Sequence, residues 1–218
     1  FIMTLVTIIV FYPLLFILMT SFKDYADVIR NPFGISTFIP QNYTTAWVMG
    51  RVQQYFKNSA IVTTLAILGQ LMLVSLSAFA IGRLRFKGAV VVSFVLLSTM
   101  FVTGEMTTIP NYMTIRGLGL LNTLGALILP TAFGPPGLGV FMASSFVKKV
   151  PHEIEEAAII DGCGIMKMFF TIDLPLMRPI LSLIAILTFQ GVWSDFFWPL
   201  ITVIGNERAK TLPLGLIN

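Results

Sequence analysis

Side chains that could perform covalent chemistry are scarce in this chain of 218 residues. It has one histidine, His152, and one cysteine, Cys163, so neither a zinc cluster, a Cys/His dyad nor an internal disulfide can form. The nucleotide-binding pattern G-x-x-x-x-G-K-[ST] does not occur either. Several of the ten acidic residues lie between positions 153 and 161. We therefore expect no catalytic, metal or cofactor site, and the chain is predicted not to be an enzyme.

The acidic residues between positions 153 and 161 have a mechanical explanation. Pro151 suits a first helical position, and Glu153, Glu155 and Glu156 then fall in the opening turn, where acidic side chains favour the positive end of the helix dipole. Ala157 and Ala158 are strong helix formers with almost no side chain, so another chain can approach them closely. Asp161-Gly162 is typical of a turn that ends a helix.

A second short helix is predicted after this turn. Residues 165–172 are apolar enough to lie against a membrane domain, and Pro175 is expected to end the helix. The result is a helix, a sharp turn and another helix. A plainer interpretation, in which solvated acids only cap the first helix, is preferred for Glu153 and Glu155. His152 is expected to be exposed at the helix start.

The composition places these helices in a membrane protein. Hydrophobic residues make up 56% of the chain and charged residues 11%, and the mean hydropathy is +0.88. Five uncharged stretches are near or above the roughly 17 to 25 residues that cross a bilayer as a helix. These stretches are residues 1–22, 58–82, 88–104, 117–147 and 179–194. The sequence therefore predicts five membrane spans.

The stretch 117–147 is too long for one span and is interrupted by Pro130 and by the run 134–137, Gly-Pro-Pro-Gly. It predicts a short helix, an irregular break and a second helix. Because non-helical backbone at membrane depth must be shielded, the break is expected to face a cavity or a neighbouring helix. A tilted helix with a proline kink is an equal alternative.

Basic residues predict the orientation. Arg83, Arg85 and Lys87 form one cluster and Lys148-Lys149 another, and both are expected in the cytoplasm by the positive-inside rule. Two spans separate the clusters, which agrees with this placement. The net charge of +4 therefore reflects topology and contact with membrane lipid. Nucleic-acid binding is excluded, because the basic residues are scattered and lack a stacking platform.

The spacing of the acidic segment resembles the EAA motif of ABC importer permeases. Glu156-Ala157-Ala158 is followed after three residues by Gly162, and after nine more by Ile172, Asp173 and Leu174-Pro175. Further segments, in order, are similar to the carbohydrate-type branch of these permeases, and to the second membrane subunit of maltose-type importers. They are Tyr12 to Lys23, Asn42 to Trp47, Tyr55 to Ser59, Ala78 to Gly88, Gly117 to Thr123, Phe146 to Gly162 and Trp193 to Leu200.

This resemblance implies an all-α, polytopic transmembrane helical bundle with the type I ABC importer membrane-domain fold. Residues 1–218 are expected to form a single permease domain that is truncated at both ends, with a sixth span beyond the C-terminus. Residues 21–58 are expected to be an external segment, and residues 148–178 the cytoplasmic EAA coupling loop. The expected location is the cytoplasmic (inner) membrane of a bacterium or archaeon.

The resemblance also implies a function. The chain is expected to form half of the translocation path for a sugar or related polyol. Its expected partners are a second permease subunit, two copies of an ATPase that bind ATP and Mg²⁺, and an extracytoplasmic solute-binding protein. No cofactor is expected in the chain itself. The residues expected to couple to the ATPase are Glu153, Glu156, Ala157, Ala158, Asp161 and Gly162.

Polar and aromatic residues near the spans are candidates for the translocation path, since ionisable groups in a membrane are costly. These candidates are Glu105, Trp193, Asp195 and Phe196. For Asp195 the preferred interpretation is an aromatic belt near water or a contact with the partner subunit. Gln70 and Gln190 are predicted to hydrogen-bond between helices.

Two rival classes of function remain. A self-contained channel or ion-driven secondary transporter would use Glu105 and Asp195 for the driving ion. A membrane enzyme acting on lipid-linked substrates would need converging acids, histidines or a metal site, and the chain offers almost none of these. Neither rival explains an EAA loop.

Overall fold

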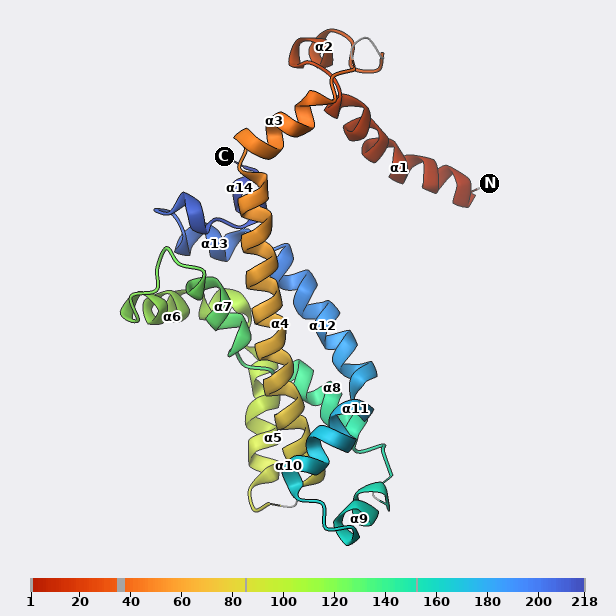
Figure 1. Cartoon of the computed structure of the whole chain (residues 1–218), viewed down its shortest axis with the longest axis vertical. Helices are drawn as coiled ribbons and strands as arrows, with labels where there is room; N and C mark the ends of the chain where they lie inside the picture. Colours follow the sequence, from red (N-terminus) through yellow and green to blue (C-terminus); the bar gives the residue numbers. More distant parts are fainter. Residues whose placement is uncertain (1, 35–37, 85, 152, 218) are drawn as a thin grey trace. The chain divides into compact units, whose positions relative to one another are not determined.

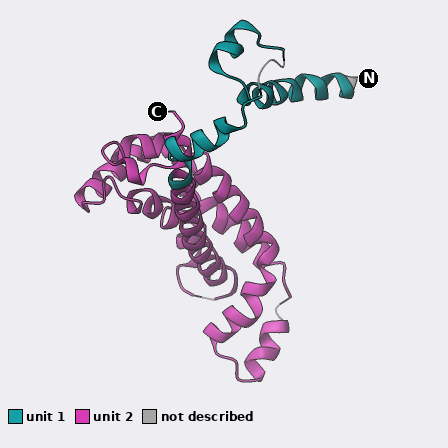
Figure 2. Ribbon diagram, turned by 45° about the horizontal axis from the view of Figure 1, so that its top comes forward, with its two compact units in different colours: residues 1–54 teal, residues 55–218 magenta. Residues whose placement is uncertain are grey.

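The computed structural model describes residues 2–34, 38–84, 86–151 and 153–217, and within these ranges the regular structure is helical without strands (Figure 1). Two residues discussed above, Arg85 and His152, lie outside the described residues. The chain divides into two compact units, Phe1–Gln54 and Tyr55–Asn218 (Figure 2).

The first unit contains α1 (Ile2–Ser21), α2 (Tyr25–Arg30) and α3 (Gln41–Met49). Residues 3–21 of α1 are apolar and long enough to cross a membrane, and most of their side chains are exposed. The side chain of Asn42 donates hydrogen bonds to the carbonyls of Ser21 (3.1 Å) and Lys23 (2.9 Å). It thereby satisfies backbone acceptors where α1 ends.

The second unit is built around α4, a helix of 32 residues that begins at Val52 and ends at Arg83. The elements after α4 are α5 (Ala89–Ser98), η1 (Thr99–Phe101), α6 (Gly104–Gly117), α7 (Gly125–Ala132), α8 (Gly137–Val147), α9 (Glu153–Ile160), α10 (Ile165–Met168), η2 (Phe169–Asp173), α11 (Leu174–Leu176), α12 (Arg178–Trp193), α13 (Phe197–Thr202), η3 (Glu207–Ala209) and α14 (Leu212–Gly215).

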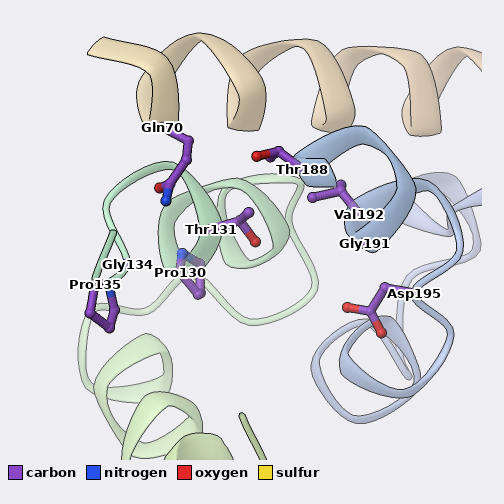
Figure 3. Close-up of a pocket in the computed structure, with 9 residues that line it drawn as sticks. All are labelled: Gln70, Pro130, Thr131, Gly134, Pro135, Thr188, Gly191, Val192 and Asp195. Carbon is purple, nitrogen blue, oxygen red and sulfur yellow. The ribbon is translucent and has the colours of Figure 1, made fainter. Parts of the chain in front are cut away.

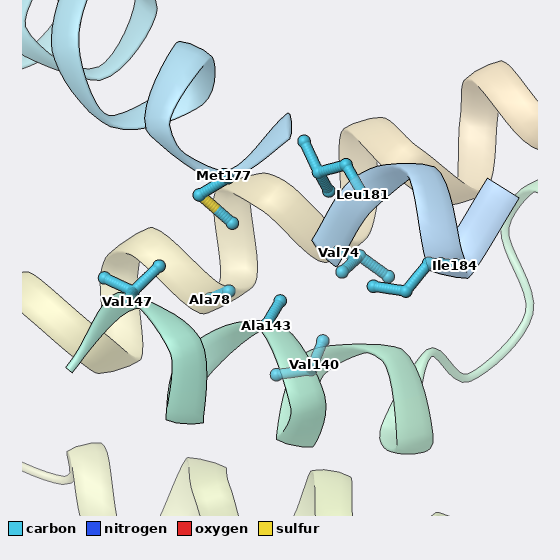
Figure 4. Packing of buried hydrophobic residues seen from close by; sticks show 8 residues of the cluster. All are labelled: Val74, Ala78, Val140, Ala143, Val147, Met177, Leu181 and Ile184. Atoms are coloured by element: carbon cyan, nitrogen blue, oxygen red, sulfur yellow. The ribbon is translucent and has the colours of Figure 1, made fainter. Parts of the chain in front are cut away.

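The main core joins α4, α8 and α12 (Figure 4). Its buried residues are Val74, Ala78, Val140, Ala143, Val147, Met177, Leu181 and Ile184. Glycines let these helices approach closely: a Cβ at Gly139 would lie 2.8 Å from Val74 Cγ2, and one at Gly82 would lie 3.0 Å from Val147 Cγ1. Small residues at helix contacts are typical of membrane bundles, in which close packing drives helix association.

Counting each bent pair as one span gives the predicted number, although the third pair includes residues 165–176 of the predicted cytoplasmic loop. Two single helices are long and apolar enough to cross a membrane, and three bent pairs bring the number to as many as five within the described residues. The predicted interruption of 117–147 is confirmed. There, α7 and α8 are bent by 42° and separated by residues 133–136, while Pro130 lies inside α7.

Two details differ from the prediction. The stretch 88–104 does not form one straight helix: α5 ends at Ser98, and α6 then departs at 102° from the direction of α5 and η1. Pro175 does not end the second helix of the loop, which continues as α11 to Leu176. The π-helical turn η2 precedes this proline. Pro175 lies in the first turn of α11, where the missing N–H of proline is tolerated.

Candidate functional site

The predicted turn between the two helices of the loop is present and has a specific geometry. Gly162 has φ +78°, in the left-handed region that favours glycine. Its N–H donates to the carbonyl of Ile159, and the N–H of Cys163 donates to the carbonyl of Ala158, both at 2.9 Å. This pair of bonds is a Schellman motif, which ends α9 and satisfies its last carbonyls.

Most of the residues expected to contact an ATPase are exposed on α9 and its turn. Glu153, Glu156, Ala157, Asp161 and Gly162 are exposed, and Ala158 is half-buried. Three isoleucines of the same helix, Ile154, Ile159 and Ile160, are also exposed. We call these nine residues the α9 surface. Exposed apolar side chains beside charged ones are typical of a protein contact site.

Glu155 behaves differently from its neighbours. Its side chain is only 9% exposed, and its Oε1 lies 2.5 Å from Nε of Arg83, whose own side chain is 1% exposed. The preferred interpretation of Glu155 as a solvated capping acid is therefore wrong. The reason is a tertiary contact. The guanidinium of Arg83, at the end of α4, is buried, and a buried charge needs a partner of opposite charge, which Glu155 provides.

Asp173 completes this cluster and was not singled out from the sequence. Its side chain is 2% exposed, and its Oδ1 lies 3.7 Å from Arg83 Nε. Arg83 also donates a hydrogen bond from Nη2 to the carbonyl of Val150, at 3.1 Å. The sequence signal for this residue is an acid within the otherwise apolar run Ile172-Asp173-Leu174, and this pattern does not indicate which residue the acid pairs with.

Two adjoining cavities, of about 330 and 610 Å³, lie in the second unit. Both are lined by Pro130, Thr131 and Asp195. The smaller is also lined by Gln70 of α4 and by Thr188 of α12 (Figure 3). The larger extends to Glu105, Thr107 and Thr108 of α6, and to Phe197 and Trp198 of α13. Hydroxyl, amide, carboxylate and aromatic groups therefore border a space wide enough for a sugar unit.

The structure brings together two of the four predicted path residues. Glu105 and Asp195 line the same larger cavity. Trp193 instead stacks on Phe189, with ring centroids 5.3 Å apart. Neither Trp193 nor Phe196 is among the residues that line the two cavities.

Asp195 lies in the short connection between the end of α12 at Trp193 and the start of α13 at Phe197. Its Oδ1 accepts a hydrogen bond from the N–H of Trp198 at 3.2 Å. Burial raises the pKa of Asp195, and hydrogen bonds from the backbone of Trp198 and Phe197 oppose that rise. The carboxylate thus has both a capping role and a place on the cavity wall.

Gln70 was predicted to hydrogen-bond between helices. Its Oε1 is buried and accepts no hydrogen bond from the described residues, so the expected interhelical bond through this oxygen is absent. Its side chain instead lines the smaller cavity (Figure 3). Gln190 is exposed.

The first turns of α4 within the second unit hold the polar segment that follows α13. Asn58 Nδ2 donates to the carbonyls of Arg208 and Lys210, each at 2.8 Å, and the N–H of Leu212 donates to Ser59 Oγ at 2.8 Å. Tyr55 Oη donates to Glu207 at 3.2 Å. Sequence reasoning noticed the segment Tyr55 to Ser59 but assigned it no contact.

Comparison with known proteins identifies the family. The family described as "Binding-protein-dependent transport system inner membrane component" matches residues 115–212. YurM of Bacillus subtilis, a probable ABC transporter permease protein, is 35% identical over 207 residues, which cover 94% of this chain and 68% of that relative. The chain belongs to this family of ABC transporter permeases. The family assigned from the sequence is therefore confirmed, and this permease is a multi-pass transport subunit of an ABC importer.

Other relatives carry the names of sugar systems. NgcG of Streptomyces coelicolor, a diacetylchitobiose uptake system permease protein, is 34% identical, and the match covers 88% of this permease and 64% of NgcG. AraQ of Halalkalibacterium halodurans, an arabinooligosaccharides transport system permease protein, is 31% identical, with 94% and 74% covered. The permease thus spans 64% to 74% of the length of these relatives.

A solved structure shares the fold. This permease matches a chain of a bacterial ABC transporter involved in the import of the acidic polysaccharide alginate, with a TM-score of 0.80. The match covers 99% of the permease and 75% of that chain at 22% identity, so the likeness bears on the fold alone. It confirms the predicted helical membrane-domain fold of an ABC importer. Membership of a binding-protein-dependent family implies a solute-binding protein and an ATPase as partners.

Proposed function

We propose that this permease forms half of the translocation path for an oligosaccharide or a related polyol and couples to its ATPase through the α9 surface. In this proposal it pairs with a second permease subunit, two ATPase copies that hold ATP and Mg²⁺, and an extracytoplasmic solute-binding protein. It is embedded in a bacterial or archaeal cytoplasmic membrane and itself binds no cofactor. The sugar names of NgcG and AraQ support the class of solute.

The observation that carries the proposal is the division of α9 into two sides. Glu155 is buried against Arg83, whereas Glu153 and Glu156 are exposed beside exposed isoleucines. One side of α9 is thus bound to the end of α4, and the other side is free to contact a partner. Glu156 provides a charge for a basic group on the ATPase, and Ala157 leaves space for close approach.

Coupling through such a helix is a two-state equilibrium. If closure of the ATPase dimer favours one position of α9, the same position favours ATPase closure, because linkage is reciprocal. A loaded binding protein that stabilises the corresponding state of the membrane helices then stimulates ATP hydrolysis. The permease contributes no bond-making step. A self-contained channel would have no use for the α9 surface.

The first experiment tests the ATPase contact. We expect the tagged parent, purified from its native host in mild detergent, to retain an ATPase containing a P-loop and a second permease. Glu156→Lys is expected to retain at least tenfold less ATPase, because the charge contact becomes repulsive. Asp24→Lys, a reversal at an exposed acid of the first unit, is the matched control and is expected to equal the parent. A parent that purifies without an ATPase would overturn the proposal in favour of the channel or ion-driven transporter.

The second experiment tests the solute class. Cells that express the complete system are supplied with labelled maltotriose, arabinotriose or diacetylchitobiose. We expect ATP-dependent uptake of at least one of these sugars, and its loss in Glu156→Lys. If an assembled and ATP-hydrolysing complex transports none of them and instead takes up amino acids or ions, the solute class is wrong while the coupling proposal stands.

A further inference from the structure

Arg83 joins three parts of the second unit that are distant in sequence. Arg83 is the last residue of α4, and it meets the carbonyl of Val150 before α9, the carboxylate of Glu155 on α9 and the carboxylate of Asp173 at the end of η2. The two carboxylates belong to opposite arms of the loop, one on each side of the Gly162 turn. One guanidinium therefore contacts both arms.

The cluster is buried, so its charges depend on one another. The side chains of Arg83, Glu155 and Asp173 are 1%, 9% and 2% exposed. Water screens such charges poorly, and removal of one partner leaves the others uncompensated. The apolar cluster of Phe79, Met168 and Phe169 adds a second contact between α4 and the second arm. The loop is thus fixed to the end of α4 by charge and by packing.

The same helix reaches the cavity. Gln70, in the middle of α4, lines the smaller cavity, and Val74 and Ala78 lie in the core with α8 and α12. A helix is stiff along its axis, so a displacement at Arg83 also displaces the cavity wall at Gln70. The α9 surface and the cavity therefore share one rigid element.

We infer that Arg83 is a positioning residue that holds both arms of the coupling loop on the end of α4, so that movement of α9 by the ATPase is passed to the cavity through α4. This inference rests on the proposed coupling function. Arginine suits the role because its planar fork presents five donors to several acceptors at once. A lysine presents all of its donors from one nitrogen and cannot reach acceptors as widely spaced, so Arg83→Lys is expected to retain only part of the coupling.

The functional test compares Arg83→Gln with Lys87→Gln, an exposed base in the connection after α4. Reconstituted complexes are assayed, per assembled complex, for basal ATPase activity, for stimulation by the solute-binding protein and for uptake of the sugar that the parent imports among maltotriose, arabinotriose and diacetylchitobiose. Arg83→Gln is expected to keep basal ATPase within twofold, lose the stimulation and lose uptake at least tenfold. Lys87→Gln is expected to match the parent. Parental stimulation and uptake in Arg83→Gln would overturn the inference.

A neutral triple variant separates positioning from stability. Arg83→Gln alone leaves two buried carboxylates without their partner and is expected to assemble poorly. The combination of Arg83→Gln, Glu155→Gln and Asp173→Asn removes all three charges and is expected to assemble better. If the charged link is needed for coupling, the triple variant still lacks stimulation and uptake. Recovery of both by the triple variant would show that the cluster serves assembly only, which contradicts the inference.

Cys163 provides a test that needs neither sugar nor ATPase. It is the single cysteine of the chain, and it is half-buried beside the Gly162 turn. Membranes are treated with a maleimide, and the labelled fraction of this subunit is followed by mass spectrometry. Release of the loop in Arg83→Gln is expected to speed labelling at least fivefold, with Lys87→Gln unchanged. Equal rates in both variants would show that Arg83 does not hold the loop.

Failure of the inference is distinguishable from failure of the proposed function. If the proposed function is wrong, the parent itself lacks a bound ATPase and ATP-dependent uptake. If only the inference is wrong, the parent hydrolyses ATP and imports sugar, and either Arg83→Gln or the neutral triple variant does the same.

Discussion

At the scale of single residues, Glu155 and Glu156 are neighbours in the sequence with opposite surroundings. Glu155 is buried against Arg83, whereas Glu156 is exposed. An α-helix turns by about 100° per residue, so adjacent positions in one acidic run face different sides. The exposed acid suits recognition of a partner, and the buried acid suits attachment of the helix. The motif predicted the role of the exposed Glu156 but not the burial of Glu155.

Gly162 permits the first test at this scale. Its φ of +78° places an alanine in the left-handed region, which costs about 1 to 2 kcal/mol, although nothing lies within 4 Å of the new Cβ. We expect Gly162→Ala to reduce the ATPase recovered with the purified permease about three- to tenfold, and Gly162→Asn to reduce it less. Gly164→Ala is the matched control, since Gly164 has an ordinary φ of −72° and equally open surroundings. Equal losses at both glycines would exclude backbone strain as the cause.

At the scale of elements, the sequence predicted what local patterns determine. The uncharged runs predicted the candidate spans, and the Gly-Pro-Pro-Gly run predicted the break between α7 and α8. The 102° bend before α6 and a 73° bend between Ile165–Leu176 and α12 were not predictable in this way, because tertiary packing sets the direction of a helix after a break. The prediction that Pro175 ends the helix was wrong because this proline lies in the first turn of α11, a position that tolerates its missing N–H. The pairing of Arg83 with Asp173 has no local signature at all.

Contact between α4 and α7 provides the prediction at this scale. A Cβ at Gly69 would lie 2.6 Å from Ala132 Cβ and 3.0 Å from its backbone. Gly69→Ala is therefore expected to push the two helices apart and destabilise the purified complex by about 1 to 3 kcal/mol. A lower midpoint of thermal unfolding in detergent would report this change. Gly117→Ala, at a glycine with nothing within 4 Å, is the control. A midpoint equal to that of the control would show that α4 and α7 separate at little cost.

At the scale of the whole second unit, α4 connects three regions. Arg83 contacts the loop that carries α9, Gln70 lines a cavity, and Asn58 donates hydrogen bonds to the backbone of Arg208 and Lys210. These contacts are spread along one continuous helix, so the loop, the cavity and the polar segment after α13 cannot move independently of it. The smaller cavity meets α4 at Gln70, between the other two regions, so under the proposed function it can respond to both.

A substitution at Asp195 tests whether these cavities carry solute, because Asp195 lines both of them. Asparagine keeps an oxygen that can accept the N–H of Trp198, so Asp195→Asn removes the charge and preserves the start of α13. Loss of a charged hydrogen bond to a sugar hydroxyl costs about 1.5 to 3 kcal/mol, which corresponds to a rise of roughly ten- to a hundredfold in the KM for uptake. Asp24→Asn, at an exposed acid, is expected to leave KM unchanged. An unchanged KM in Asp195→Asn, with the complex assembled, would restrict this carboxylate to capping α13.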